Sequence, residues 1–109
     1  MTDKDLYGGL IRLHILHHAA EKPVFGLGII EELDRHGYEI SPGTLYPMLH
    51  SLEKKGYLTS KQQTVRQRTR RVYIITKTGR AALMDARVKV SELFGELFDG
   101  LQSTDNMMK

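Results

Sequence analysis

Residues 40–58 read ISPGTLYPMLHSLEKKGYL, and this stretch decides the fold. Ser41 and Pro42 are typical of a helix start, because serine can cap free backbone N–H groups and proline suits the first helical position. An apolar stripe at helical spacing follows, made of Leu45, Leu49 and Leu52. Gly56 is typical of a helix end. Pro47 lies beyond the first turn and removes a hydrogen bond, so we expect a distorted or late-starting helix.

Two further helices are expected before this one. Apolar residues recur at helical spacing between about 5 and 20, and a shorter pattern runs from about 25 to 36, where Gly37 stops it. A short capped helix that follows another helix across a tight glycine turn is the arrangement that places a recognition helix in the major groove of DNA. The face opposite the leucine stripe presents Thr44, Pro47, Met48, Ser51 and Lys55.

After the third helix the period of the pattern changes. Residues 57–65 and 69–76 are rich in β-branched and aromatic side chains, which predicts two strands. The polar residues 66–68 lie between them and form the expected tip of a β-hairpin. A long helix follows, capped by Thr76 or Thr78. The hairpin would form a basic arm beside the recognition helix.

The last helix carries more apolar surface than a small domain can cover. Left exposed, its stripe would form a sticky patch, so pairing with a second copy is expected, and the alternative is a helix folded back on its own domain. On this helix the expected dimer interface is Leu83, Val90, Leu93, Phe94, Leu97 and Leu101. A two-fold pair would set two recognition helices about one DNA turn apart and predicts a pseudo-palindromic operator.

The order of elements indicates a mainly helical α+β fold of one small domain's size, since the chain has 109 residues. The expected organisation is a winged helix-turn-helix DNA-binding domain over residues 1–76, a C-terminal dimerisation helix over 77–101, and a disordered tail over 102–109.

Positive charge is concentrated in one part of the chain. From Lys54 to Met84 there are nine basic residues and no acidic one, whereas the rest holds the other seven basic residues and all thirteen acidic ones. The two parts carry formal charges of +9 and −6. Such segregation favours a polyanionic partner, here double-stranded DNA, and the alternative is a basic strand pair that is merely solvated.

Several other classes are disfavoured. The chain has no cysteine, which excludes disulfides, thiolate zinc sites and cysteine nucleophiles. No apolar run approaches the roughly 20 residues that span a bilayer, and acids stand where a secretory signal would be basic, so we expect a cytoplasmic protein with no membrane partner. No nucleophile–base pair or glycine-rich phosphate loop is visible, so we expect neither an enzyme nor a cofactor.

Three blocks together closely resemble the PadR family of transcriptional regulators. They are ISPGTLYPML at 40–49, LEKKGYL at 52–58 and RVYIITKTG at 71–79, and the resemblance covers residues 8–98. The motifs G-T-L-Y-P, L-E-x-x-G and Y-x-x-T-x-x-G, in this order and at suitable spacing, are a specific signal. The resemblance implies a winged-helix domain and repression that ligands relieve. It also implies a dimer built from the last and first helices, which adds Leu10 of the first helix to the expected interface. The chain is similar to the short-tailed subgroup, which has one C-terminal helix.

By this resemblance, the recognition-helix motif contains Ser41, Gly43, Thr44, Tyr46 and Pro47, and the wing contains Arg66, Arg68 and Arg70. With Ser51 and Lys55 of the helix and Lys61 of the arm, they are the candidate DNA contacts. The Tyr46 hydroxyl can touch phosphate, or the ring can pack against the second helix, and both remain open. Many relatives have Gly-Tyr at the start of the second helix, where this chain has Gly26-Leu27-Gly28, so any role of that tyrosine is lost.

Two smaller features complete the prediction. A small-molecule effector is expected between the paired long helices and the first helices, with Phe94 and Phe98 as stacking residues. His14, His17 and His18 are notable because histidines at i and i+4 can grip zinc. No third ligand or nearby acid is apparent, so we expect surface or interface histidines and no metal.

The sequence thus predicts a sequence-specific DNA-binding transcriptional regulator, a ligand-responsive repressor that acts as a homodimer. The alternative is a winged-helix module for protein–protein contacts without direct DNA binding.

Overall fold

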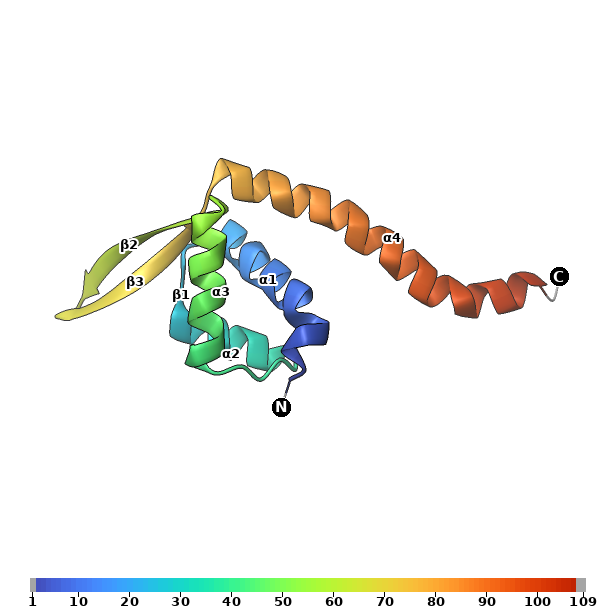
Figure 1. The fold of residues 1–109 in the computed structure, drawn as a ribbon, viewed down its shortest axis with the longest axis horizontal. Coiled ribbons are helices and arrows are strands. Elements are labelled where there is room, and N and C mark those ends of the chain that lie inside the picture. The colour runs from blue at the N-terminus through green and yellow to red at the C-terminus, as the bar shows by residue number, and fades with distance from the viewer. Residues whose placement is uncertain (1, 108–109) are drawn as a thin grey trace.

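The computed structural model describes residues 2–107, and the side chains of residues 2–99. In chain order the elements are α1 (Lys4–Glu21), β1 (Val24–Phe25), α2 (Gly26–Arg35), α3 (Pro42–Lys54), β2 (Leu58–Val65), β3 (Arg68–Ile75) and α4 (Lys77–Met107). Helices α1, α2 and α3 gather into one body, from which the β2–β3 hairpin extends on one side and α4 on the other (Figure 1). The predicted order and the mainly helical α+β class are confirmed.

One apolar core lies among the three short helices and the base of the hairpin. Its fully buried side chains are Ile11, Ile15, Ile29, Leu33, Leu45, Leu49 and Leu58. The predicted leucine stripe of α3 is therefore buried. The prediction that Met48 faces outward is wrong, because Met48 is only 6% exposed. Positions 45, 48, 49 and 52 follow i, i+3, i+4 and i+7 spacing, which places them on a single helix face.

Helix α3 begins at Pro42, so the expectation of a late start is wrong. Pro47 stands inside the helix and lacks the N–H that would bond the carbonyl of Gly43. Gly43 is exposed, so water can satisfy that carbonyl. Ser41 occupies the N-cap position as predicted, but its side chain makes no capping hydrogen bond. Its hydroxyl instead lies 3.4 Å from the Thr44 hydroxyl.

Glycine turns end both α2 and α3, as the sequence predicted. Gly37 has φ +87°, and the N–H of Tyr38 donates to the carbonyl of Leu33 at 2.9 Å. Gly56 repeats this geometry with φ +81°. In this helix ending, one residue takes a left-handed backbone conformation, and the N–H of the next residue donates to a carbonyl five residues earlier. The last carbonyls of the helix are then satisfied, and glycine adopts the left-handed conformation at the least cost. The turn at Gly37 sets the direction in which the chain continues from α2 toward α3.

The strands of the described chain form one antiparallel sheet in the order β1-β3-β2. Strand β1 was not predicted, since two residues are too short to show an alternating pattern. The hairpin pairs Leu58 with Ile75 at its base and Val65 with Arg68 at its end. The turn is therefore Arg66-Gln67, and the placement of Arg68 in the tip is wrong. Both turn residues have positive φ, which matches the twist of two antiparallel strands.

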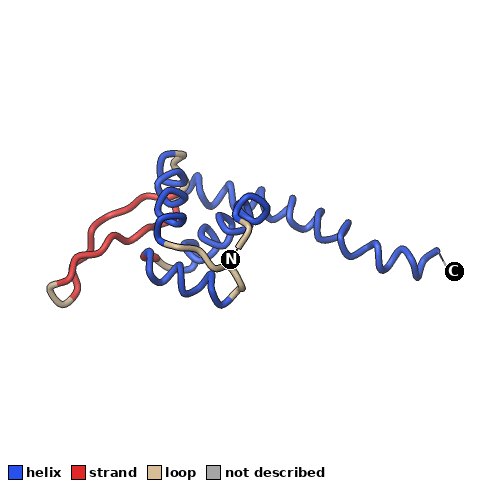
Figure 2. Tube along the Cα trace, turned by 60° about the horizontal axis from the view of Figure 1, so that its bottom comes forward, coloured by secondary structure: helices blue, strands red, loops and turns tan. Residues whose placement is uncertain are grey.

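Helix α4 begins at a cap made by Thr76 rather than Thr78, because the Thr76 hydroxyl accepts a hydrogen bond from the N–H of Gly79 at 2.9 Å. The first part of α4 packs on the body through Leu83, and the rest projects away from it (Figure 2). The radius of gyration is 16.8 Å, whereas a compact domain of 100 residues has about 13 Å. The projecting helix accounts for the difference.

The structure carries α4 through Met107, past the predicted end at residue 101. The side chains of residues 100–109 lie outside the described part of the chain, and so does that of the predicted interface residue Leu101. The expected disorder of residues 102–109 stays a prediction.

Candidate nucleic-acid interface

The basic side chains of the wing separate onto two faces of the hairpin. Successive residues of a strand point to opposite faces, so Arg68, Arg70 and Val72 share one face. Phe25 pairs with Val72 and lies on that face as well. The guanidinium carbon of Arg70 lies 3.9 Å from the centroid of the Phe25 ring. This cation–π contact holds Arg70 in place beside the body of the protein.

Arg71 lies on the opposite face of the hairpin and is used internally. It donates a hydrogen bond of 2.9 Å to the Ser60 hydroxyl, which in turn donates to the carboxylate of Glu53 on α3 at 2.6 Å. This chain of bonds ties the base of the wing to the end of the recognition helix. Among the described residues, Arg66, Arg68 and Arg70 make no side-chain hydrogen bond or salt bridge, and all three are exposed.

A hollow of about 690 Å³ joins the wing to the recognition helix. Arg66, Arg68 and Arg70 line it from the hairpin, and Tyr46 lines it from α3. Leu27 of α2 also borders this hollow, at the position where many relatives are expected to have tyrosine. The structure therefore places the predicted wing arginines on the same side as the exposed face of α3.

Tyr46 packs against the start of α2. A β-carbon built on Gly26 would overlap the Tyr46 hydroxyl, so the ring tip lies directly over the bare glycine backbone. The side chain is 47% exposed. Of the two uses left open for this tyrosine, the structure favours packing on the second helix. A glycine at the first position of α2 allows the close approach.

The remaining candidates are spread along α3 and the hairpin. Ser41, Gly43 and Pro47 are exposed, whereas Thr44 and Ser51 are half-buried. Lys55 is the C-cap of α3, at the far end of the helix from Ser41. Neither Lys55 nor the exposed Lys61 of β2 lines the hollow.

Sequence reasoning missed Lys4, which belongs to the same surface. Its ammonium lies 3.5 Å from the Thr44 hydroxyl, which brings a cation of α1 to the start of α3. The two residues are 40 positions apart in the chain. Nothing in the local pattern around Lys4 indicates this contact.

The apolar stripe of α4 is exposed over most of the described helix. Leu93, Phe94 and Leu97 are 51%, 60% and 64% exposed. Leu10 of α1 and Val90 are also exposed, whereas Leu83 packs against the chain's own core. The alternative of a helix folded back on its own domain does not hold for this part of α4.

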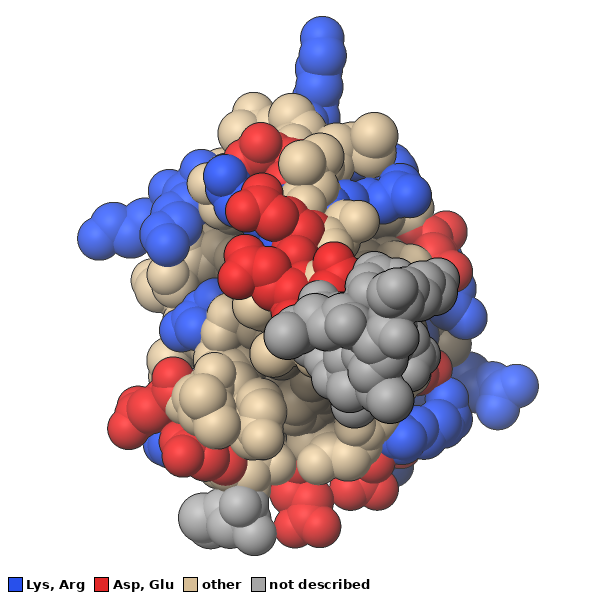
Figure 3. Space-filling model, turned by 90° about the vertical axis from the view of Figure 1, so that its right-hand side faces the viewer, with Lys and Arg blue, Asp and Glu red and all other residues tan. Residues whose placement is uncertain are grey.

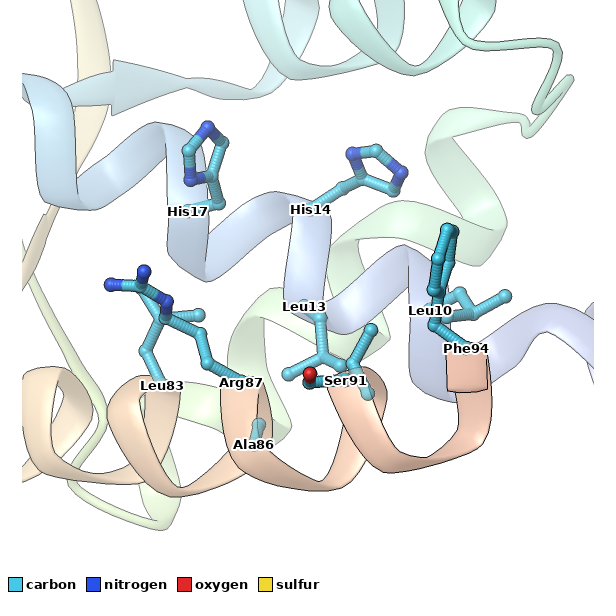
Figure 4. A pocket seen from close by; sticks show the side chains of 10 residues that line it. Leu10, Leu13, His14, His17, Leu83, Ala86, Arg87, Ser91 and Phe94 are labelled. Carbon is cyan, nitrogen blue, oxygen red and sulfur yellow. The ribbon is translucent and has the colours of Figure 1, made fainter. Parts of the chain in front are cut away.

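A groove of about 490 Å³ runs between α1 and α4 (Figure 4). Leu10 and Leu13 point into it from α1, and Leu83 and Phe94 approach it from α4. Phe98 does not line the groove, but its ring centroid lies 4.5 Å from that of Phe94. Only one of the two predicted effector residues therefore borders it.

The interpretation that the α1 histidines lack a third partner is wrong. His36, at the C-cap of α2, joins His14 and His18 in one cluster, and the ring centroids of His14 and His36 are 4.6 Å apart. The carboxylate of Glu32 lies beside the cluster. Sequence spacing finds His14 and His18 but gives no signal for a partner on another helix.

Acidic residues gather elsewhere on the molecule. Seen from the C-terminal end of α4, acidic side chains form a patch on this face, and Lys and Arg side chains project at its rim (Figure 3). The hairpin lies on the opposite side of the body from this end (Figure 1). The four arginines of the hairpin, Arg66, Arg68, Arg70 and Arg71, therefore lie away from this acidic patch. Among the described residues, no helix is both long and apolar enough to cross a membrane.

Three helices followed by a two-stranded wing define a winged helix-turn-helix protein. The chain belongs to the transcriptional regulator PadR-like family, whose pattern matches residues 15–85. The resemblance noted in the sequence is thereby confirmed, and the family consists of DNA-binding transcriptional regulators rather than enzymes.

Relatives agree in sequence and in fold. The chain is 53% identical over 94 residues to transcriptional regulator Rv3488 of Mycobacterium tuberculosis, covering 86% of this chain and 88% of that protein. It is similar to the crystal structure of smu.1704 from Streptococcus mutans UA159, with 30% identity, a TM-score of 0.76, and coverage of 86% and 87%. A PadR family transcriptional regulator from Eggerthella lenta is 26% identical, with a TM-score of 0.77 and coverage of 89% and 86%.

Proposed function

We propose that this chain is a sequence-specific repressor that acts as a homodimer on a pseudo-palindromic operator and is released by a small-molecule ligand. The observation that carries the proposal is the shared hollow, which Tyr46 of α3 and Arg66, Arg68 and Arg70 of the wing line together. One duplex can then meet both elements at once. A DNA-binding regulator acts where the chromosome lies, so we place the protein in the cytoplasm.

Each element has its own task in this proposal. The exposed first turn of α3 enters the major groove, where the Thr44 hydroxyl and the uncapped helix start meet base edges and phosphate. The wing reaches the adjoining backbone or minor groove, where arginine is favoured. Phe25 orients Arg70 toward that surface. Phosphate contacts supply most of the affinity, and direct contacts to bases supply the sequence preference.

The second copy covers the exposed stripe of α4. Leu93, Phe94 and Leu97 would otherwise leave a contiguous apolar patch in water, which is unusual for a monomer. A two-fold pair also places two recognition helices about 34–36 Å apart, one turn of DNA. The two half-sites of the operator follow from that symmetry.

The effector of this proposal binds in the groove between α1 and α4. Apolar side chains of both helices line most of the groove, including Phe94 on α4, and His14, His17, Arg87 and Ser91 also border it. It adjoins the surface that the partner would cover, so a ligand there can alter the angle between two paired subunits. Effector binding and dimer geometry are therefore coupled in this proposal.

The test separates the contribution of the wing to DNA binding from that of the recognition helix. We expect Arg68→Ala to weaken binding to all DNA sequences and to lower the slope of log affinity against log salt by about 1. We expect Thr44→Ala to act on the preferred site, with a cost of about 1–3 kcal/mol. Fluorescence anisotropy on the chain's own upstream promoter and on a scrambled fragment, at several salt concentrations, measures both effects.

Lys89→Ala is the matched control, because it removes the same charge from an exposed position on α4, away from the wing. It should leave both affinities within about twofold, since surface changes away from contacts cost little. Equal loss on both fragments from Arg68→Ala and Thr44→Ala would contradict the division of tasks. A weak salt slope together with no footprint on DNA would favour the protein–protein alternative.

A further inference from the structure

A compact cluster of histidines lies between α1 and the end of α2, outside the DNA-binding surface. His14 and His18 are one turn apart on α1, and His36 is the C-cap residue of α2. One nitrogen from each of the three rings lies within 4.8 Å of the others. His14 and His18 approach this point from α1, and His36 approaches it from the end of α2. A ligand at this point can therefore contact three imidazoles rather than two.

Glu32 brings a carboxylate beside two of the three histidines. Its Oε2 atom lies 4.0 Å from Nε2 of His18 and 3.9 Å from Nε2 of His36. In a tetrahedral zinc site with bonds of about 2.0–2.1 Å, neighbouring ligand atoms stand about 3.4 Å apart. The two carboxylate distances exceed this value by about half an ångström, and the histidine nitrogens lie within 4.8 Å of one another. His36 is exposed enough to rotate inward.

We propose that His14, His18, His36 and Glu32 bind one divalent transition-metal ion of the zinc, nickel and cobalt class. Imidazole nitrogens with one carboxylate suit these ions, whereas magnesium and calcium prefer sites built from oxygen. The chain has no cysteine, so no thiolate competes for the ion.

An unsatisfied atom supports this assignment. Nε2 of His18 is buried and has no hydrogen-bond partner among the described residues. A buried polar nitrogen without a partner is costly, and such atoms in native structures call for an explanation. A metal ion at the centre of the cluster would satisfy it.

A hydrogen bond outside the cluster orients its carboxylate. Arg35 donates a 2.7 Å hydrogen bond to Oε1 of Glu32, which leaves Oε2 facing the histidines. The carboxylate is therefore held beside the cluster by a contact that does not use the oxygen proposed to bind the ion.

A second group on α1, made of His17, His18 and Glu21, competes for the same residue. Both groups use His18, so one ion excludes the other. The side chains of His17 and Glu21 are 59% and 62% exposed, and all three residues come from one helix. The cluster with His36 is more enclosed and joins two elements, which is why we assign the ion to it.

The test uses the full-length chain without a histidine tag, stripped of metal with a chelator. We expect one Zn²⁺ per chain by calorimetry, visible ligand-field absorption when Co²⁺ is added, and no heat with Mg²⁺. His36→Ala should weaken Zn²⁺ binding by at least about 100-fold, the upper end of the loss when a supporting residue of a metal site is removed. Zn²⁺ should raise the thermal midpoint of the parent chain but not that of His36→Ala, because only binding to the folded state stabilises it.

The controls decide between the two groups. His36 is 45% exposed, so His36→Ala should fold, and circular dichroism checks this. His17→Ala tests the competing group, and His50→Ala removes an exposed histidine of α3 outside both. We expect both controls to bind Zn²⁺ within threefold of the parent chain. The proposal is overturned if the parent chain binds no Zn²⁺, if His36→Ala binds as tightly as the parent, or if His17→Ala abolishes binding.

Discussion

The double variant Phe94→Glu, Leu97→Glu is expected to be a monomer that binds operator DNA at least about 100-fold more weakly than the parent chain, because linked binding of two half-sites is lost. Both side chains are more than half exposed in the single chain, so the change costs its fold little. In the proposed dimer they are buried against the partner, where two carboxylates without partners are strongly unfavourable. The variant therefore separates dimerisation from folding.

Light scattering coupled to size exclusion gives the mass, and anisotropy on a two-half-site duplex gives the affinity. Val88→Glu is the matched control, since Val88 is 67% exposed but lies on the other side of α4 from Phe94 and Leu97. It should remain a dimer with the parent's affinity. A double variant that stays dimeric, or a Val88→Glu chain that dissociates, would contradict the proposed interface.

Local features of the fold were predictable because they depend on neighbours in the chain. Gly37 and Gly56 mark helix ends by their own backbone conformation, whatever packs around them. Thr76 caps α4 through the N–H of Gly79, three residues away. The leucine stripe of α3 follows from helical spacing alone. Such rules operate within one or two turns, and they are visible in a sequence.

What the sequence did not reveal depends on contacts between distant residues. Strand β1 exists because Val24 and Phe25 meet β3, and the pair is too short to show a pattern. Lys4 reaches Thr44 from another helix. His36 completes the histidine cluster only because the turn after α2 carries it back toward α1. Each case needs tertiary structure, which periodicity and spacing do not contain.

The proposed DNA-binding surface depends on both local pattern and tertiary structure. Charge segregation and the G-T-L-Y-P motif located its two halves, α3 and the wing, from the sequence. Their relation to each other comes from the β-hairpin register, which places Arg68 and Arg70 on the Phe25 face. A shift of one residue would have turned both arginines to the other side. Which of the predicted residues contact DNA stays a prediction, and only the fold shows how these residues lie relative to one another.

Gly79→Ala is expected to lower the free energy of unfolding by about 3 kcal/mol, near the upper end for an overpacked site. A β-carbon at this position would overlap the backbone carbonyl of Tyr57 and the side chain of Ile75. The same carbonyl accepts hydrogen bonds from the N–H and the hydroxyl of Thr76, the cap of α4. Backbone cannot rotate aside, so the first turn of α4 must move away from the hairpin base.

Gly9→Ala serves as the comparison, because no atom lies within 4 Å of its added β-carbon and the site is exposed on α1. That change should stabilise the chain by up to about 1 kcal/mol through helix propensity. Urea unfolding at one fixed protein concentration measures both, since the stability of a dimer depends on concentration. A Gly79→Ala chain as stable as the parent would show that α4 can shift freely at its start.

The junction at Gly79 also sets the direction of α4. Relative to the parent chain, the folded fraction of Gly79→Ala should therefore lose more affinity for a two-half-site duplex than for a single half-site.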